Sequence, residues 1–477
     1  MERAYGRVTP EMARELRGIV GDGGVIFDDP EELRPYGFDV LALLHGKAHP
    51  PEAVVKPRTA EQVSEILKLA NRETIPVTAR GAGSGLAGAA IPTHGGISLS
   101  LERMNRILEI DRVDRVAVVE PGVVTNDLCE QVAQEGLMYA GYPMSTETSF
   151  IGGNVATNAG GGRVIRYGNT RRHVMGLEVV LANGEVIEVG GKYRKSTWGY
   201  DLLNLMIGSE GTLGIFTKIV LNLISAPKKT MDVLVPFPDT ETAVSAVAEV
   251  IISEGIVPET VEFMDRICFV ESSKHHEIAL PIRDADRAGA FLIIQLQGET
   301  EEELEELCRK AGETCMAQGA IDVLVAVSAQ HSKDIWKIRE RYGEGVARAG
   351  PNAFFTSDVV VPFSKVPDMM RELARMEQKY GIEIPTVGHI ADGNLHSALF
   401  KPDDVSVEDW PEKAESIFDE MSSIAVELGG VGSGEHGVGL LKRPLFLKIK
   451  TETELALMRG IKQLFDPKQI LNPGKII

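Results

Sequence analysis

Three glycine-rich segments in the first half of the chain constrain its fold most strongly. They cover residues 80–88, 143–162 and 208–215, and short strand-like runs such as 75–79 and 97–101 separate them. Because glycine has no Cβ, loops of this kind bring bare backbone N–H groups close to an anion. Three such loops exceed what surface turns require. Together they predict one long dinucleotide lying across an α+β domain.

A Rossmann domain is the first alternative for the 80–88 loop. Gly83, Gly85 and Gly88 have the Rossmann fingerprint spacing. That fold requires a helix and then an acid-tipped second strand, whereas residues 97–101 read as another plain strand. We therefore expect a different dinucleotide-binding fold.

Two later stretches combine glycine with histidine. Residues 388–396 read Gly-His-Ile-Ala-Asp-Gly-Asn-Leu-His, and residues 432–439 contain Glu435 and His436. Asp-Gly is a strong signal for a two-residue hairpin turn, which would place His389 opposite His396 with Cβ atoms about 5 Å apart. Such a pair is half of a divalent metal site, to which Glu435 could add a carboxylate and His436 a base.

Charge and composition exclude several classes of protein. The 477-residue chain has a net charge of −19, which argues against nucleic acid and anionic membrane surfaces as partners. It lacks both an apolar run long enough to span a bilayer and an apolar signal core, so we do not expect an integral membrane protein. Its four cysteines form no Cys-x-x-Cys pair, which excludes ordinary iron–sulfur ligation and makes a reducing cytoplasm the expected location.

The composition and the hydrophobic pattern of the sequence change near Ala226, where glycine becomes rarer and long amphipathic segments begin. We expect strands at 231–236, 290–297 and 321–327, and helices at 240–254, 299–318, 364–380 and 409–428. This pattern favours an antiparallel sheet backed by helices. The predicted divisions are a helical lead-in (1–48), a cofactor domain (49–227), a cap domain (228–430) and a C-terminal segment that returns to the cofactor domain (431–477).

Four motifs in this order carry a resemblance to a known family. They are Lys-Pro-Arg-Thr at 56–59 with the 80–85 loop, the segment 151–161, Gly-Ser-Glu-Gly-Thr-Leu-Gly at 208–214, and the histidine motifs closing with Leu-Asn-Pro-Gly-Lys at 471–475. From about residue 50 onward, the chain resembles the flavin-dependent D-2-hydroxyacid dehydrogenases of the vanillyl-alcohol-oxidase type. These include D-lactate dehydrogenases and the catalytic subunit of glycolate oxidase.

The resemblance implies an α+β fold, with a two-subdomain FAD-binding domain of the vanillyl-alcohol-oxidase type and an antiparallel-sheet cap domain. The flavin should be non-covalent, because residues 80–88 contain no histidine for attachment. For Asn472 a simple turn before Pro473 is the alternative role. The implied FAD-binding residues are Arg80, Gly81, Ala82, Gly83, Ser84, Gly85, Pro143, Gly152, Gly153, Asn154, Asn158, Gly160, Gly161, Glu210, Gly211, Gly214, Ile215 and Asn472.

The resemblance also implies oxidation of a D-2-hydroxy acid to the 2-oxo acid, by metal-assisted hydride transfer to flavin N5. His389, His396 and Glu435 would bind Zn, Mn or Fe, and His436 would be the general base. Arg339 would bind the substrate carboxylate. The alternative for Arg339 is a surface arginine paired with Glu340 or Glu344.

Three positions suggest a small substrate. Relatives that handle diacids carry extra polar or cationic groups where this chain has Gly343, Thr356 and Ala398, so D-lactate or glycolate is favoured. The electrons would pass to a partner, such as an electron-transfer flavoprotein or an iron–sulfur subunit, or to a diffusible acceptor.

Three other functions are open from the sequence. A non-redox enzyme on the same scaffold, such as an ether-lipid synthase, would leave the histidine pair unused. A non-catalytic electron-transfer subunit should lack the five candidate metal-binding and catalytic residues. A metal hydrolase would leave the three glycine-rich loops unexplained.

Overall fold

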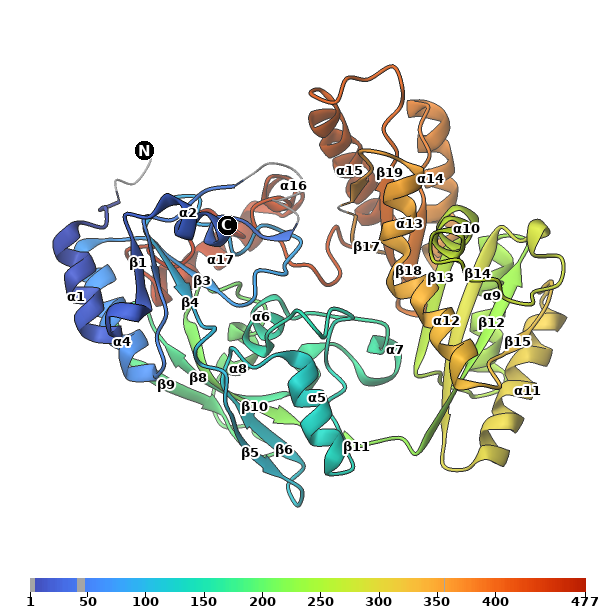
Figure 1. Cartoon of the computed structure of the whole chain (residues 1–477), viewed down its shortest axis with the longest axis horizontal. Helices are drawn as coiled ribbons and strands as arrows, with labels where there is room; N and C mark the ends of the chain where they lie inside the picture. The colour runs from blue at the N-terminus through green and yellow to red at the C-terminus, as the bar shows by residue number, and fades with distance from the viewer. Residues whose placement is uncertain (1–4, 41–47, 356) are drawn as a thin grey trace. The chain divides into compact units, whose positions relative to one another are not determined.

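The computed structural model describes residues 5–40, 48–355 and 357–477, which divide into two compact units. Unit 1 comprises the described residues of Met1–Gly160, Asn169–Ala226 and Glu435–Ile477, and unit 2 comprises Gly161–Gly168 and Pro227–Gly434. The chain therefore passes between the units four times, and each unit has its own sheets and core (Figure 1).

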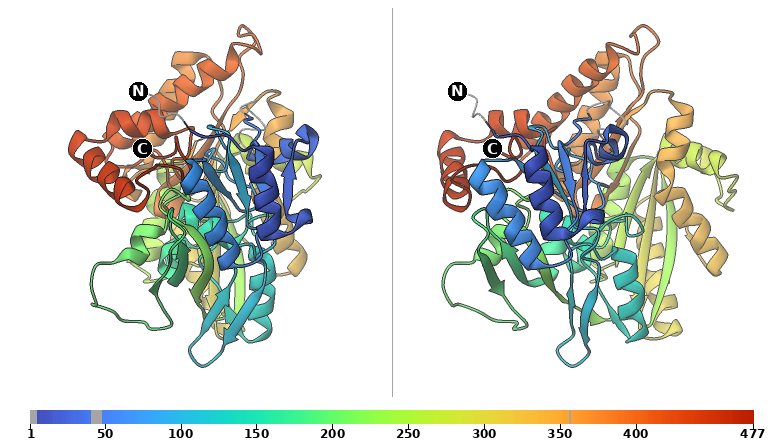
Figure 2. Two further views of the ribbon diagram at one scale, coloured as in Figure 1. Left: turned by 90° about the vertical axis from the view of Figure 1, so that its left-hand side faces the viewer. Right: turned by 60° about the vertical axis from the view of Figure 1, so that its left-hand side comes forward.

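The first sheet of unit 1 has the order β1-β2-β4-β3. Strands β2, β4 and β3 run parallel, and β1 adds an antiparallel edge from within the predicted helical lead-in. Helices α1 (Pro10–Val20) and α4 (Ala60–Glu73) lie side by side against this sheet (Figure 2, dark and mid blue). A short helix, α2 (Pro30–Leu33), follows β1. The four strands are Val25–Phe27 (β1), Ala53–Val55 (β2), Val77–Arg80 (β3) and Ile97–Ser100 (β4).

Helix α4 shows how the sequence sets the local structure. Thr59 caps it by accepting a hydrogen bond from the Gln62 backbone N–H at 3.3 Å, as expected for a capping threonine. Val63, Ile66 and Leu67 recur at helical spacing and are fully buried against the sheet. In a full capping box the Gln62 side chain would accept a hydrogen bond from the Thr59 N–H. Here it accepts from the Arg58 N–H instead.

The second sheet of unit 1 is antiparallel, with the order β5-β6-β10-β8-β9. It includes the β8–β9 hairpin, which turns at Asn183-Gly184. The helices in this part of the chain are α5 (Thr125–Gln134), α6 (Ile151–Thr157) and α8 (Leu202–Met206). Short strands β7 (Leu137–Met138) and β11 (Ile224–Ser225) pair separately. The five strands are Ile107–Asp111 (β5), Val116–Val119 (β6), Val174–Val180 (β8), Val186–Gly190 (β9) and Ile215–Asn222 (β10).

The C-terminal segment belongs to unit 1. After α16 (Arg443–Ile449) and α17 (Glu452–Phe465), the chain adds a bridge to the edge of the first sheet, where Leu471 lies beside Val77. The Val77 N–H donates to the Ile470 carbonyl at 2.7 Å, and the Asn472 N–H donates to the Val77 carbonyl at 2.8 Å. These bonds fix the tail next to the strand that leads into the first glycine-rich loop.

Unit 2 is built on one large antiparallel sheet of order β15-β12-β14-β13-β18-β19-β16, with β17 also paired to β19. The mixed α+β class predicted from the sequence, with an antiparallel sheet in the second half, is confirmed. The strands are Lys229–Phe237 (β12), Thr260–Asp265 (β13), Ala290–Gly298 (β14), Leu324–Val325 (β15), Phe354–Phe355 (β16), Val359–Val360 (β17), Thr386–His389 (β18) and Asn394–Leu399 (β19).

Helices cover both faces of this sheet. On one face the core joins Val233 and Leu292 to residues of α9, α11, α14 and α15, and on the other Leu234 and Ile293 pack with residues of α10, α12 and α13. This alternation along a strand is the two-residue period of a sheet buried on both sides. The helices are α7 (Val164–Tyr167), α9 (Thr240–Ile252), α10 (Arg266–His275), α11 (Glu301–Ala317), α12 (Ala329–Glu340), α13 (Tyr342–Ala349), α14 (Val366–Tyr380) and α15 (Trp410–Glu427).

The histidine hairpin forms, but the predicted register is wrong. A two-residue turn would pair His389 with His396, whereas His389 pairs with Asn394 and His396 pairs with Val387. The cause is a longer connection, because a 3-10 turn at Ile390–Asp392 precedes Gly393. The shift is two residues, and an even shift keeps both histidines on the same face of the sheet.

Candidate functional site

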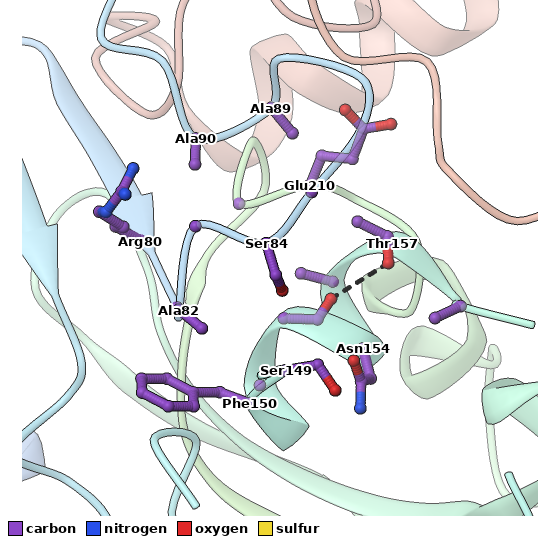
Figure 3. Close-up of a pocket in the computed structure, with 18 of the residues that line it drawn as sticks. Arg80, Ala82, Ser84, Ala89, Ala90, Ser149, Phe150, Asn154, Thr157 and Glu210 are labelled. Carbon is purple, nitrogen blue, oxygen red and sulfur yellow. Dashed lines mark hydrogen bonds between the residues drawn. The ribbon is translucent and has the colours of Figure 1, made fainter. Parts of the chain in front are cut away.

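A cavity of about 310 Å³ in unit 1 collects the three glycine-rich loops (Figure 3). The 80–88 loop, the segment that enters α6 and the loop after α8 each supply part of its wall. Fifteen of the residues expected to hold the cofactor line it: Arg80, Gly81, Ala82, Gly83, Ser84, Gly85, Pro143, Gly152, Gly153, Asn154, Gly160, Glu210, Gly211, Gly214 and Ile215.

The first loop offers backbone donors to whatever occupies this cavity. Within the described part of the chain, the N–H groups of residues 81–87 donate to no acceptor. The run ends at Gly88, whose N–H donates to Asp39 Oδ2 at 2.6 Å. A stretch of unpaired N–H groups favours an anion such as a diphosphate.

The second loop is held by side chains behind the cavity wall. Asn154 Nδ2 donates to Thr125 Oγ1 at 2.8 Å, and Thr125 Oγ1 lies 2.9 Å from Ser149 Oγ. Thr157 Oγ1 donates to the Gly153 carbonyl at 3.2 Å (Figure 3). A Cβ at Gly152 would lie 2.5 Å from the side chain of Pro121, so only glycine fits there.

Arg80 lines the cavity, but its guanidinium is engaged elsewhere. Nη1 donates to the Phe38 carbonyl at 2.8 Å and Nη2 to the Pro35 carbonyl at 3.1 Å. The side chain therefore ties the first loop to the N-terminal segment of unit 1.

Three of the expected cofactor residues do not line the cavity. Asn158, with a left-handed φ of 52°, accepts a hydrogen bond from the Arg171 N–H at 2.9 Å. Gly161 belongs to unit 2. Asn472 donates to the Ala89 carbonyl at 2.9 Å and to the Glu210 carbonyl at 2.7 Å, so it links the first and third loops behind the wall.

Glu210 connects the cavity to the C-terminal segment. Its carboxylate accepts hydrogen bonds from the N–H groups of Val438 at 2.7 Å and Gly439 at 2.8 Å. Burial raises the pKa of Glu210 to about 7, although these two N–H donors oppose the shift.

Glu435 and His436 line the same cavity of unit 1. His436 Nε2 lies 3.7 Å from Glu435 Oε1, and both side chains are largely buried. The backbone that follows is irregular, since Gly437 has φ 84° and Gly439 has φ 54°. The structure thus brings the predicted base to the wall that the glycine-rich loops form.

His389 and His396 come together in unit 2. Their rings have centroids 5.5 Å apart at an interplanar angle of 82°. His389 Nδ1 lies 2.8 and 2.9 Å from the two carboxylate oxygens of Glu262, and His396 Nδ1 lies 3.3 Å from the Ser357 carbonyl. Because these oxygens only accept, each Nδ1 carries a hydrogen, and in the neutral ring each Nε2 then has the lone pair that a metal requires.

Arg339 is buried in unit 2 beside the same carboxylate. It is 3% exposed, and its Nη2 lies 2.6 Å from Glu262 Oε2. A surface arginine paired with Glu340 or Glu344 is therefore wrong. Arg339 Nε is buried and has no acceptor among the described residues, so the guanidinium has a donor available for a ligand.

Two acidic residues at this place escaped the sequence analysis. Glu262 is fully buried, and although burial alone would raise its pKa, His389 and Arg339 lower it to about 2. Asp358, also fully buried, accepts from Asn394 Nδ2 at 3.1 Å and Ser433 Oγ at 2.9 Å. A carboxylate oxygen of Asp358 and a ring nitrogen of His396 lie within 4.8 Å of each other. A carboxylate between apolar residues in a buried strand, as in Val261-Glu262-Phe263, is the signal that could have found Glu262.

Of the positions expected to set substrate size, two are described. A Cβ at Gly343 would meet no atom within 4 Å, and Ala398 is buried in β19. Thr356 lies outside the described residues. Among the helices that the structure describes, none combines the length and apolarity needed to cross a membrane.

Comparison with known proteins agrees with this geometry. The FAD binding domain family matches residues 51–190, and the family described as FAD linked oxidases, C-terminal domain, matches residues 226–476. The chain is 35% identical to D-lactate dehydrogenase of Anaerostipes hadrus, over 100% of this chain and 99% of that protein. It is 38% identical to glycolate oxidase subunit GlcD of Bacillus subtilis strain 168, over 98% and 97%.

Solved structures show the same fold. A p-cresol methylhydroxylase crystal structure with bound substrate matches with a TM-score of 0.79 at 20% identity, over 98% of this chain and 97% of that one. The glycine-lined cavity is thus part of an FAD-binding fold of the vanillyl-alcohol-oxidase type. The chain belongs to the FAD-linked oxidases, as an oxidoreductase of the D-lactate dehydrogenase and glycolate oxidase type.

Proposed function

We propose that this protein oxidises a small D-2-hydroxy monocarboxylate, D-lactate or glycolate, to the 2-oxo acid. The observation that carries the proposal is the histidine pair of unit 2, whose rings lie 5.5 Å apart with both Nδ1 atoms hydrogen-bonded to oxygen acceptors. A redox site for a hydroxy acid needs a group that acidifies the hydroxyl, and two imidazoles prepared in this way are suited to hold a divalent metal.

His389 and His396 are the proposed metal ligands of unit 2, and Glu435 is proposed as a third from the sequence motif. Two imidazoles and a carboxylate suit Zn, Mn or Fe. Asp358 is a further candidate, because its carboxylate lies close to a ring nitrogen of His396.

The residues that line the unit 1 cavity fit FAD. The N–H groups of residues 81–87, which have no acceptor among the described residues, suit its diphosphate. The small residues around Gly152 and Gly153 let the cofactor approach the backbone closely. When bound, FAD supplies the hydride acceptor and the metal supplies a Lewis acid that acidifies the hydroxyl. His436, on the wall of this cavity, is the proposed acceptor of the hydroxyl proton, a role for which imidazole is well matched near neutral pH.

Arg339 is the proposed partner of the substrate carboxylate. Its Nε–H group is buried and without an acceptor among the described residues, and a guanidinium binds carboxylates through paired N–H groups. The favoured substrates are small because Gly343 and Ala398 add no polar or charged group to contact a second carboxylate.

The electrons are proposed to leave the flavin for another protein or for a diffusible acceptor. The cysteines are isolated in the sequence, without a Cys-x-x-Cys pair, so an iron–sulfur cluster within this chain is not expected. The relative from Bacillus subtilis is named as a subunit, which supports a partner such as an electron-transfer flavoprotein or an iron–sulfur subunit.

Anaerobic flavin reduction tests the proposal directly. FAD-loaded protein would be mixed with D-lactate, L-lactate, glycolate and D-2-hydroxyglutarate, and the metal content of the same sample measured. We expect D-lactate or glycolate to bleach the flavin fastest and about one metal per chain. Fastest bleaching by D-2-hydroxyglutarate would contradict the small-substrate proposal, and no bleaching by any hydroxy acid would favour a non-redox, ether-lipid-synthase-like reaction.

A further inference from the structure

One buried carboxylate in unit 2 contacts two residues to which the proposed function gives different roles. Glu262 lies in β13, and its side chain is fully buried. Its oxygens lie 2.8 and 2.9 Å from His389 Nδ1, and Oε2 lies 2.6 Å from Arg339 Nη2. A buried charge of this kind is costly unless it is paired, so Glu262 depends on both partners.

The sheet itself sets the contact with His389. Glu262 and His389 are directly opposite each other across the β13–β18 pair, which places their side chains on one face of the sheet. The carboxylate accepts the Nδ1 hydrogen and so fixes both the tautomer and the ring plane of His389. For His396 the acceptor at Nδ1 is a backbone carbonyl, at 3.3 Å, rather than a carboxylate.

The packing around Glu262 leaves it little freedom to move. Thr260 Oγ1 donates to Glu262 Oε1 at 2.8 Å from the same strand. A Cβ at Gly162 would collide with Glu262 Oε1 and lie 2.5 Å from Thr260 Oγ1. Gly162, which belongs to unit 2, therefore leaves the space that this carboxylate occupies.

We propose that Glu262 is a positioning residue that aligns the metal-binding imidazole of His389 with the guanidinium of Arg339. One carboxylate thereby fixes the orientation of two functional side chains from different elements, β18 and α12. The inference rests on the proposed function, because it assigns His389 to a metal and Arg339 to a substrate carboxylate.

Glu259 provides a matched control. It is also a buried carboxylate, 1% exposed, and it lies just before β13. Its partner is Arg163, whose Nε lies 2.8 Å from Glu259 Oε1. E259Q thus changes another buried carboxylate that faces an arginine next to the same strand, while leaving the contacts of His389 and Arg339 intact.

The experiment compares E262Q and E259Q in FAD-loaded, metal-stripped protein. Zn²⁺ affinity is measured by competition with a chelator, together with the melting temperature. The KM for D-lactate is measured after Zn²⁺ has been restored. We expect E262Q to bind Zn²⁺ about 10- to 100-fold more weakly, as for other carboxylates that orient a metal-binding histidine, and to raise KM. E259Q should keep both values within about threefold, because it does not touch His389 or Arg339. E262D, which keeps the charge, should recover part of the Zn²⁺ affinity.

The outcomes separate this inference from the proposed function. If wild-type protein binds Zn²⁺ and folded E262Q binds it equally well, the positioning role is overturned and the proposed function stands. If wild-type protein binds neither Zn²⁺ nor Mn²⁺ yet oxidises D-lactate, the proposed metal role fails and the inference fails with it. Should E262Q not fold, E262D decides, because withdrawing the carboxylate from Nδ1 should weaken Zn²⁺ binding at least about threefold, and unchanged affinity would overturn the role.

Discussion

The two units build their candidate sites from different parts of the chain. In unit 1 the cavity is made of loops with small side chains, and its distinctive groups are the N–H groups of residues 81–87, for which the described residues provide no acceptor. In unit 2 the site is made of ionisable side chains on strands and one helix, with Glu262, His389 and Arg339 all within 3% of full burial. A site formed by backbone N–H groups, here called a backbone site, needs small residues. A site formed by ionisable side chains, here called a side-chain site, needs buried partners that pair their charges and hydrogen bonds with one another.

This difference affects how each site should respond to mutation. A backbone site is harmed by adding atoms, since a new Cβ takes the space of the ligand or of a loop. A side-chain site is harmed by removing atoms, since a lost partner leaves a buried charge or an incorrect tautomer. The predictions below test this comparison.

The largest effect is expected for His436, the proposed general base on the wall of the unit 1 cavity. His436→Ala should lower kcat by about 100-fold or more, typical of a lost general base, while FAD content stays normal. Steady-state turnover with D-lactate and the flavin absorbance of the purified protein check this. The matched control is His49→Ala, an exposed histidine of unit 1, which should retain full turnover. Normal turnover of the His436 variant would remove this residue from the chemistry.

A smaller effect is expected from one added methyl group in the first loop. Gly83 has φ 76°, and a Cβ there would collide with the guanidinium of Arg80, whose Cζ would lie 2.5 Å away. Gly83→Ala should therefore shift Arg80 and the loop, and weaken FAD binding by about tenfold, or about 1.4 kcal/mol. Fluorescence titration of flavin-free protein with FAD measures this affinity.

Gly199→Ala is the control for backbone strain alone. Gly199 has a similar φ of 86°, but a Cβ there would meet nothing within 4 Å. We expect this variant to lose some stability and keep its FAD affinity. Equal losses of affinity in both variants would mean that strain, rather than space near the cavity, explains the effect.

The glycine-rich loops that the sequence singled out line one cavity, and the reason is physical. Glycine has few alternatives where a loop must approach a ligand or another backbone, so the requirement is visible in the residue type itself. Fifteen of the expected cofactor residues line the cavity. Asn158 and Asn472 were expected to bind the cofactor, but their amides bond to neighbouring protein segments, which a motif cannot distinguish from contact with a ligand.

The sequence identified only some of the residues of the side-chain site. His389 and His396 were identified as neighbours, and their proximity survives the register error because the shift is two residues. Glu262 was missed because strand β13 was not expected, and its partners lie 77 and 127 residues farther along the chain. Long-range pairing of buried charges depends on the sheet order, which local patterns do not specify.

An effect on stability rather than on activity is expected at Glu210, where a buried carboxylate accepts hydrogen bonds from two backbone N–H groups. Burial raises its pKa from 4.5 to about 7, despite the opposing N–H donors. The folded protein therefore binds this proton more tightly than the unfolded chain, and wild-type stability should fall as pH rises from about 4.5 through about 7. Glu210→Gln removes the ionisation, so its melting temperature relative to wild type should rise by a few degrees between about pH 5 and about pH 8.

Glu147→Gln, which alters an exposed carboxylate of the same unit, should show no such trend. A flat difference for Glu210→Gln would mean that the N–H groups of Val438 and Gly439 compensate fully for burial, so that the C-terminal segment is held equally well by a charged or a neutral side chain.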